Sequence, residues 1–313
     1  MGPGAGAPGY GGGMTQTPAP PLPGMNAPGT APAARGGGAW GPALSASRAK
    51  EFLKCPLQYR LHVVDGIREP ATPATAMGTL IHSVLEHLFD LPAAERGAER
   101  AQSMVPEAFD RLVRRDPSVA DLFADEAARQ AWLEDVRRVL GRYFQIEDPS
   151  RLEPAGREQR IDAVTPDGIR LRGFVDRIDR SPAGDLRVVD YKTGKAPQPR
   201  FVDEALYQMR FYALLLRESS RLPARTQLLY LRSGQVLTLD PLADDIERFS
   251  GELTALWGRI EAAARAGDFQ PRKNPLCGWC RVQSMCPLFG GATPELPLDR
   301  VEWLLGTRVD PVA

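Results

Sequence analysis

The stretch of residues 173–194 constrains the fold of this chain more than any other. It reads G-F-V-D-R-I-D-R, then S-P-A-G, then D-L-R-V-V-D-Y-K-T-G, which is typical of two strands joined by a short turn. Residues two apart in a strand point to the same face of the sheet. Asp190 and Lys192 are therefore expected to project together, with Tyr191 on the opposite face, and a hairpin would bring Asp176 beside them.

Two carboxylates and one ammonium group on adjacent strands form a compact site for a hard divalent cation and a positioned water. The alternative is a solvated pair, because an Asp and a Lys two residues apart on a strand often contribute under ~1 kcal/mol. The D-x-K motif is short enough to arise by chance, so the choice depends on the rest of the chain.

Composition limits the class of protein. The 313 residues are 43% hydrophobic and 25% charged, and 39 basic residues balance 39 acidic ones. A chain with no net charge is not a protein that covers nucleic acid non-specifically through a high positive charge. Any contact with nucleic acid must therefore come from a local basic patch. No apolar run is long enough to span a bilayer, and the N-terminus lacks the pattern of a signal peptide. We therefore expect a cytoplasmic protein without membrane partners, in which disulfides are disfavoured.

Residues 1–42 hold 13 Gly and 9 Pro, with Arg35 as the only charge, which predicts a disordered tail. Beyond it, amphipathic and alternating patterns predict helices, then strands, helix, hairpin and helix. The expected helices cover residues 75–91, parts of 95–115 and 119–145, 202–217 and 244–266; the expected strands cover 157–164, 169–179, 186–192, 227–232 and 235–240. This order predicts a mixed α/β core with a helical insertion.

Three further side chains carry possible site chemistry. His82 lies on the amphipathic helix, where a histidine is more often a boundary residue than a metal ligand. Gln208 and Tyr212 are four apart, which places an amide and a phenol on one face of the next helix. Both can donate hydrogen bonds to phosphate oxygens or orient a catalytic lysine. The alternative is the polar edge of a packed helix.

The cysteines form a second pattern. Cys277, Cys280 and Cys286 are spaced C-x2-C-x5-C and followed by proline, and Cys55 is the fourth cysteine of the chain. This is the spacing of metal ligands, and one distant cysteine would complete a four-thiolate set. Structural zinc favours a pair-plus-pair layout, so the one-plus-three layout favours an iron–sulfur cluster, with zinc as the alternative.

Six motifs then occur in order along the chain. They are S-x-S-x4-F-L-x-C-P from Ser45, G-T-L-I-H-x-x-L-E, G-x-V-D-R-I-D, V-D-Y-K-T-G, Q-x-x-x-Y and C-x2-C-x5-C-P. Together they resemble a stand-alone RecB-family nuclease of the PD-(D/E)XK superfamily, of the iron–sulfur type also seen in AddB and CRISPR-associated nucleases. The resemblance implies a restriction-endonuclease-like mixed sheet flanked by helices, with a helical insertion and a four-cysteine iron–sulfur staple.

The resemblance also implies domain boundaries. Residues 43–289 would form the nuclease domain, between the tail 1–42 and a C-terminal tail 290–313. Within it, the helical part covers about 73–147 and the catalytic sheet core about 157–266. The cluster-binding segment is 277–286 together with Cys55.

By position, the resemblance assigns metal binding to His82, Asp176, Asp190 and the carbonyl of Tyr191, for Mg²⁺ or Mn²⁺. Lys192 would orient or help deprotonate the attacking water. Gln208 and Tyr212 would lie by the site near DNA, and Cys55, Cys277, Cys280 and Cys286 would bind a [4Fe-4S] cluster. Two positions depart from the family pattern: Asp190 replaces the commoner Glu, and Val175 stands where the name-giving Pro would be.

The expected activity is a metal-dependent DNA exonuclease acting on single strands or ends in repair or recombination, with any helicase acting in trans. One alternative is a non-catalytic DNA-binding module with the same fold. Another is a nuclease of CRISPR adaptation.

Overall fold

The computed structural model describes residues 42–309, apart from the side chain of Arg200. All but the last residue of the predicted disordered tail, residues 1–42, lies outside this range. The end of the chain, residues 310–313, lies outside it as well.

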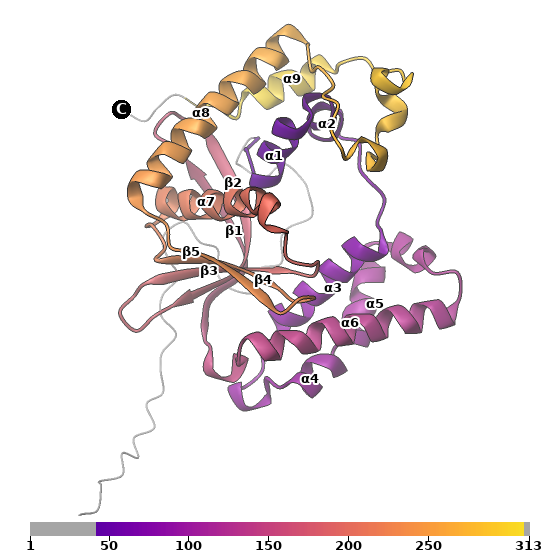
Figure 1. Ribbon diagram of the computed structural model, residues 1–313, viewed down its shortest axis with the longest axis vertical. Helices are drawn as coiled ribbons and strands as arrows, with labels where there is room; N and C mark the ends of the chain where they lie inside the picture. Colours follow the sequence, from indigo (N-terminus) through magenta and orange to yellow (C-terminus); the bar gives the residue numbers. More distant parts are fainter. Residues whose placement is uncertain (1–41, 310–313) are drawn as a thin grey trace, which may run out of the picture.

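One five-stranded mixed sheet forms the centre of the molecule (Figure 1). Its strands follow in chain order: β1 (Pro154–Val164), β2 (Arg170–Arg180), β3 (Leu186–Lys192), β4 (Arg225–Tyr230) and β5 (Gln235–Leu239). Gly184, at φ +93°, closes the turn between β2 and β3 in a conformation that glycine adopts without strain. β3 and β4 are parallel and all other pairs are antiparallel. The predicted mixed sheet is confirmed.

The parallel pair needs a crossover, which α7 (Val202–Ser219) provides between β3 and β4. α7 packs on one face of the sheet with α1 (Ala46–Lys54), α8 (Ala243–Ala266) and α9 (Leu298–Leu305). Val175, Val188 and Phe211 belong to the core between this layer and the sheet. At Gly173 an added Cβ would lie 2.6 Å from Leu215 Cδ2, so glycine allows α7 to approach β2 closely.

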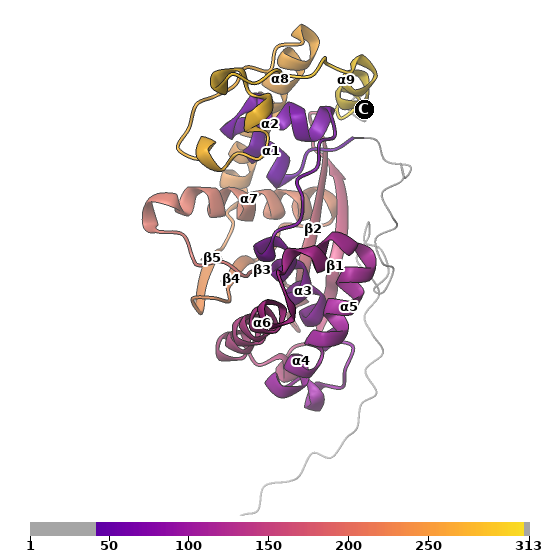
Figure 2. The same cartoon turned by 90° about the vertical axis from the view of Figure 1, so that its right-hand side faces the viewer.

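The predicted helical insertion covers the other face of the sheet (Figure 2). It contains α3 (Pro73–Leu88), α4 (Ala98–Ser103), α5 (Val105–Arg115) and α6 (Glu126–Ile146). Val189, Tyr191 and Leu229 of β3 and β4 point into this second core. The helix expected from residue 119 begins only at Glu126, because Asp125 caps it by accepting a bond from Ala128 N at 2.7 Å.

Short helical turns fill the connections. They are α2 (Pro56–Tyr59), a π-helix (Arg60–Val64) and 3₁₀ turns at Ala93–Glu95, Pro117–Leu122, Pro149–Arg151, Pro199–Phe201, Cys277–Trp279, Gln283–Met285 and Pro287–Phe289. Cys55 lies at the break between α1 and α2, where its backbone is extended at φ −159° before Pro56.

The described part of the C-terminal segment packs against the main body. Val301 and Leu304 of α9 are buried in the core formed with α7 and α8, and Ile169 bridges to Arg308 beside β2. Residues 298–308 are therefore part of the folded unit, because the apolar face of α9 completes that core. Within residues 42–309, no helix has both the length and the apolar character that crossing a membrane requires.

Candidate metal and catalytic site

The carboxyl end of β3 and the adjoining part of β2 bring three predicted side chains together. Antiparallel pairing joins Arg177 to Val189, so the residues beside them, Asp176 and Asp190, are neighbours across the two strands. Lys192 Nζ lies 2.6 Å from Asp190 Oδ2, and Tyr191 N donates to Asp176 Oδ2 at 2.6 Å. Two carboxylates and one amine converge where β2 and β3 meet, as expected for strand residues two apart that share a face and for a hairpin that pairs the two strands.

His82 reaches this point from α3. Its Nε2 lies 2.9 Å from the carbonyl oxygen of Tyr191, and its Nδ1 lies 3.4 Å from Asp176 Oδ1. α3 starts at a capping box in which Thr72 and Thr75 bond each other's backbone, which fixes the start of the helix that carries the imidazole. The structure thus places the four predicted metal-binding groups, His82, Asp176, Asp190 and the Tyr191 carbonyl, at one location.

Glu158 of β1 also belongs to this site, and the sequence patterns did not indicate it. Its Oε1 lies 3.7 Å from His82 Nδ1, and ligand atoms of Glu158, His82 and Asp176 all lie within 4.8 Å of one another. Its φ of +42° is the only positive value at a non-glycine residue in the described chain. Such strain is often found at functional sites. An acid in a predicted strand is the only sequence signal, because the register of β1 on β2 decides what it faces.

Gln208 and Tyr212 of α7 both contact Asp190. Gln208 Nε2 donates to Asp190 Oδ1 at 2.9 Å, and the Tyr212 hydroxyl lies 3.2 Å from the same oxygen and 3.1 Å from the carbonyl of Phe174. Burial, followed by the charge of Asp190, raises the pKa of Tyr212 well above its ordinary value, so it is a neutral donor. The two side chains therefore orient an acid of the site, at the place where the Q-x-x-x-Y motif predicted them.

The electrostatics of the site favour a bound cation. Burial and then the charge of Asp190 raise the pKa of Asp176 to about 6. Burial opposes protonation of His82, but the charge of Asp176 and its hydrogen bond raise the pKa of His82 well above the ordinary value. Crowded, desolvated carboxylates are the arrangement that a divalent cation stabilises. The donor set of carboxylate, carbonyl and imidazole fits Mg²⁺ or Mn²⁺.

Replacing Glu158 with glutamine is expected to weaken Mn²⁺ binding at least about tenfold, since metal-site carboxylates have effects of this size. Titration calorimetry with Mn²⁺ measures the affinity. Glu153→Gln provides a matched control, because Glu153 lies directly before β1 and its side chain is 79% exposed. Equal Mn²⁺ affinities for the two variants would remove Glu158 from the site.

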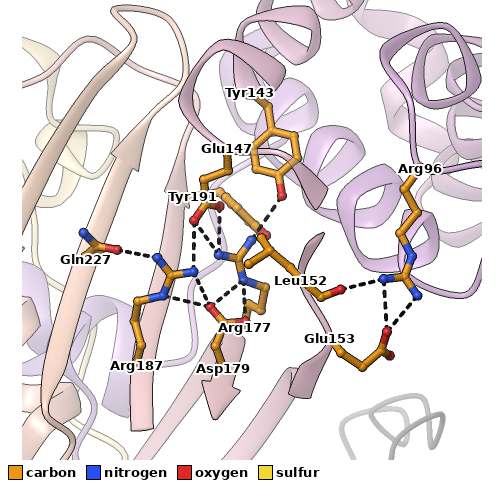
Figure 3. Close-up of polar contacts among 10 residues, drawn as sticks. All are labelled: Arg96, Tyr143, Glu147, Leu152, Glu153, Arg177, Asp179, Arg187, Tyr191 and Gln227. Carbon is orange, nitrogen blue, oxygen red and sulfur yellow. Dashed lines mark hydrogen bonds and ion pairs between the residues drawn. The ribbon is translucent and has the colours of Figure 1, made fainter. Parts of the chain in front are cut away.

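A buried arginine network next to the candidate site ties α6 to β2 and β3 (Figure 3). Arg177 donates to both carboxylate oxygens of Glu147 at 2.9 and 2.8 Å and pairs with Asp179 at 3.1 Å. Its Nη1 also donates to the hydroxyls of Tyr143 at 3.1 Å and Tyr191 at 2.8 Å. The side chain of Tyr191 is thus held by Arg177, while its backbone contacts Asp176 and His82.

Arg177→Met is expected to destabilise the fold by about 3 kcal/mol, because it leaves partly buried Glu147 and Asp179 with Arg187 as their one remaining cation among the described residues and removes the donor to the buried hydroxyls of Tyr143 and Tyr191. Chemical denaturation measures the loss. Arg96→Met is the matched comparison: Arg96 is also buried and also links the helical layer to the start of β1, but its acidic partner Glu153 is exposed. A loss for Arg96→Met as large as that for Arg177→Met would contradict this account.

The four cysteines surround one small cavity of about 30 Å³ beside α1. Cys286 is buried with Leu57, Leu61 and Val282, and Cys55 and Cys280 pack against this group. Backbone N–H groups of Arg272 and Asn274 point at the sulfurs of Cys55 and Cys277 at 3.4 and 3.3 Å. The cavity and these N–H···S contacts suit a thiolate-bound group.

Known proteins resemble the chain over much of its length. The Gene 69 protein of Mycobacterium phage L5 is 26% identical over 293 residues, covering 79% of this chain and 97% of that protein. A subunit of the ATP-dependent helicase/deoxyribonuclease of Streptococcus mutans is 29% identical over 157 residues, covering 49% of this chain and 14% of that protein. Among solved structures, SSO0001 matches at a TM-score of 0.38 and 15% identity, covering 79% of this chain and 86% of that one.

One further comparison, with a family of known sequences, agrees with the fold and with the pair of acids and the lysine at the candidate site. The sequence model of the PD-(D/E)XK nuclease superfamily matches residues 43–287. That match covers well over half of the chain and includes every residue of the candidate site. The protein belongs to the PD-(D/E)XK nuclease superfamily.

Proposed function

We propose that this protein is a divalent-metal-dependent deoxyribonuclease that hydrolyses phosphodiester bonds in single-stranded DNA or at DNA ends. The convergence of Asp176, Asp190 and Lys192, with His82 closing the site, is the observation that carries the proposal. Asp176 and Asp190 are buried, but Lys192 is 31% and His82 27% exposed. A phosphate group could therefore reach them from solvent.

In this proposal His82, Asp176, Asp190 and the Tyr191 carbonyl hold Mg²⁺ or Mn²⁺, with Glu158 as a further acidic partner. The bound ion supplies Lewis-acid polarisation of the scissile phosphate and a more acidic water. Lys192 orients that water and stabilises negative charge on the phosphate oxygens during attack. Gln208 and Tyr212 keep Asp190 in position by their hydrogen bonds.

The proposal includes a [4Fe-4S] cluster bound by Cys55, Cys277, Cys280 and Cys286. The shared cavity, the N–H···S contacts and the one-plus-three spacing of the cysteines support it. Its role is structural, because it would join α1 to a C-terminal segment with little regular secondary structure.

The Streptococcus mutans relative belongs to a helicase/deoxyribonuclease, and the matched segment makes up 14% of it. We therefore also propose that a helicase acts in trans where duplex DNA must be opened.

The direct test uses end-labelled single-stranded and duplex DNA with purified, cluster-loaded protein and Mg²⁺ or Mn²⁺. We expect metal-dependent release of nucleotides or short fragments, abolished by a chelator of divalent ions. Binding of DNA without cleavage in any of these metals would instead support a non-catalytic module with the nuclease fold.

A further inference from the structure

Exposed apolar side chains gather around the cysteine cavity. Leu276, Leu288 and Phe289 are 48%, 50% and 46% exposed and line the cavity, and Trp279, in the same segment, is 78% exposed. Trp279 is the most exposed of the large apolar side chains in residues 42–309. A solvent-exposed indole beside other exposed apolar side chains indicates a binding surface.

The same segment is basic, although the chain as a whole is neutral. Residues 269–294 contain Arg272, Lys273 and Arg281 and no Asp or Glu. Lys273 and Arg281 are exposed and form no ion pair with any acid of the described chain. Exposed aromatic rings among unpaired cations are the combination that binds single-stranded nucleic acid, by stacking bases and attracting phosphates. A surface without acids is complementary to a polyanion.

Helix α1 connects this surface to the candidate site. Lys54, at its end, lines the cysteine cavity, and Arg272 donates to the carbonyl of Leu53 beside it. Lys50 lies one turn earlier on the same face of the helix. Both views show α1 between α7 and the C-terminal turns (Figures 1 and 2).

Lys50 is half-buried on α1, which packs against α7, and Gln208 and Tyr212 of α7 contact Asp190 of the candidate site. Burial, followed by the positive charge of Lys192, lowers the pKa of Lys50. Neither Lys50 nor Lys54 forms an ion pair within residues 42–309. Two ammonium groups that lack acidic partners therefore lie along α1, between the cysteine cavity and the helix α7 that contacts the candidate site.

We propose that a single strand of DNA lies along α1, with a base stacked on Trp279 and phosphates bound by Lys54 and Lys50, before it reaches Lys192. This track rests on the proposed deoxyribonuclease function and names the form of DNA that the site accepts. An unpaired base is required, because a base inside a duplex does not offer its face to an indole.

Binding without cleavage tests the track. Fluorescence anisotropy of a labelled oligothymidylate of twelve nucleotides, in buffer free of divalent ions, gives the Kd of the protein for single-stranded DNA at several salt concentrations. Trp279→Ala is expected to weaken binding about tenfold, as loss of one stacking platform does, and Trp279→Phe should recover most of it. The double variant Lys50→Ala/Lys54→Ala should reduce the salt slope by about 1.4, at about 0.7 per phosphate contact.

Leu242→Ala is the matched control, because Leu242 is 65% exposed and lies before α8, outside the proposed track. It should bind the oligonucleotide like wild type. Unchanged oligothymidylate binding in Trp279→Ala and an unchanged salt slope in the double lysine variant would overturn the track and assign the surface to another partner. If the variants weaken binding as expected but wild type cleaves no DNA, the track stands and the proposed function fails.

Discussion

Lys192→Ala is expected to lower the rate of DNA cleavage by about two to three orders of magnitude, the usual cost of removing one group that stabilises transition-state charge. The fold should change little, because the side chain is 31% exposed and its one ion pair is with Asp190. Single-turnover cleavage of end-labelled DNA with saturating Mn²⁺ measures the chemical step. Thermal unfolding of the same preparation verifies the fold.

Lys195→Ala is the matched control, because it removes the same charge from an exposed position three residues further along the chain. We expect it to cleave at close to the wild-type rate. Asp190→Asn should lose activity as Lys192→Ala does, since it weakens both metal binding and the contact with the lysine. Comparable rates for Lys192→Ala and Lys195→Ala would show that the amine at residue 192 has no part in the reaction.

Cys286→Ser is expected to remove the visible chromophore and bound iron and to destabilise the protein strongly. A cluster that joins Cys55 to Cys277 closes a loop of about 220 residues, and closure of a loop this long is worth about 5 kcal/mol by chain entropy. Cys286 is itself buried among Leu57, Leu61 and Val282, so the serine hydroxyl would also be poorly accommodated. Anaerobic purification, a visible spectrum, metal analysis and thermal unfolding supply the measurements.

Ser284→Ala serves as the control in the same segment, because Ser284 is exposed and lies two residues before Cys286. It should keep its iron and its thermal stability. One zinc per chain in wild type, with no visible absorption, would exclude the iron–sulfur proposal.

Much of the fold followed from local patterns. The pattern over residues 186–192 identified β3 and placed Asp190 and Lys192 on one face, and the helical spacing around His82 identified α3. Such patterns are readable because each buried face repeats with the period of its element. The alternating patterns over residues 227–232 and 235–240 likewise identified the hairpin of β4 and β5.

Other features required the packed structure. Glu158 enters the site through the register of β1 on β2 and a left-handed backbone, and neither has a sequence signature. Arg177 is fully buried, which no local pattern indicated, because Glu147 arrives from the end of α6 to pair with it. The apolar face of α9 is buried against α8, and this contact between separate helices has no local signature.

Local patterns were enough to assign a side chain to one face of its strand or helix, because that face depends on backbone geometry within a few residues. Long-range packing brought the groups together: an imidazole and an acid from separate layers at one end of β3, and a cysteine next to α1 beside three from the C-terminal segment. Contacts between distant segments depend on how whole layers of helices and strands pack. The spacing of residues along the chain does not specify how close two such segments come in space.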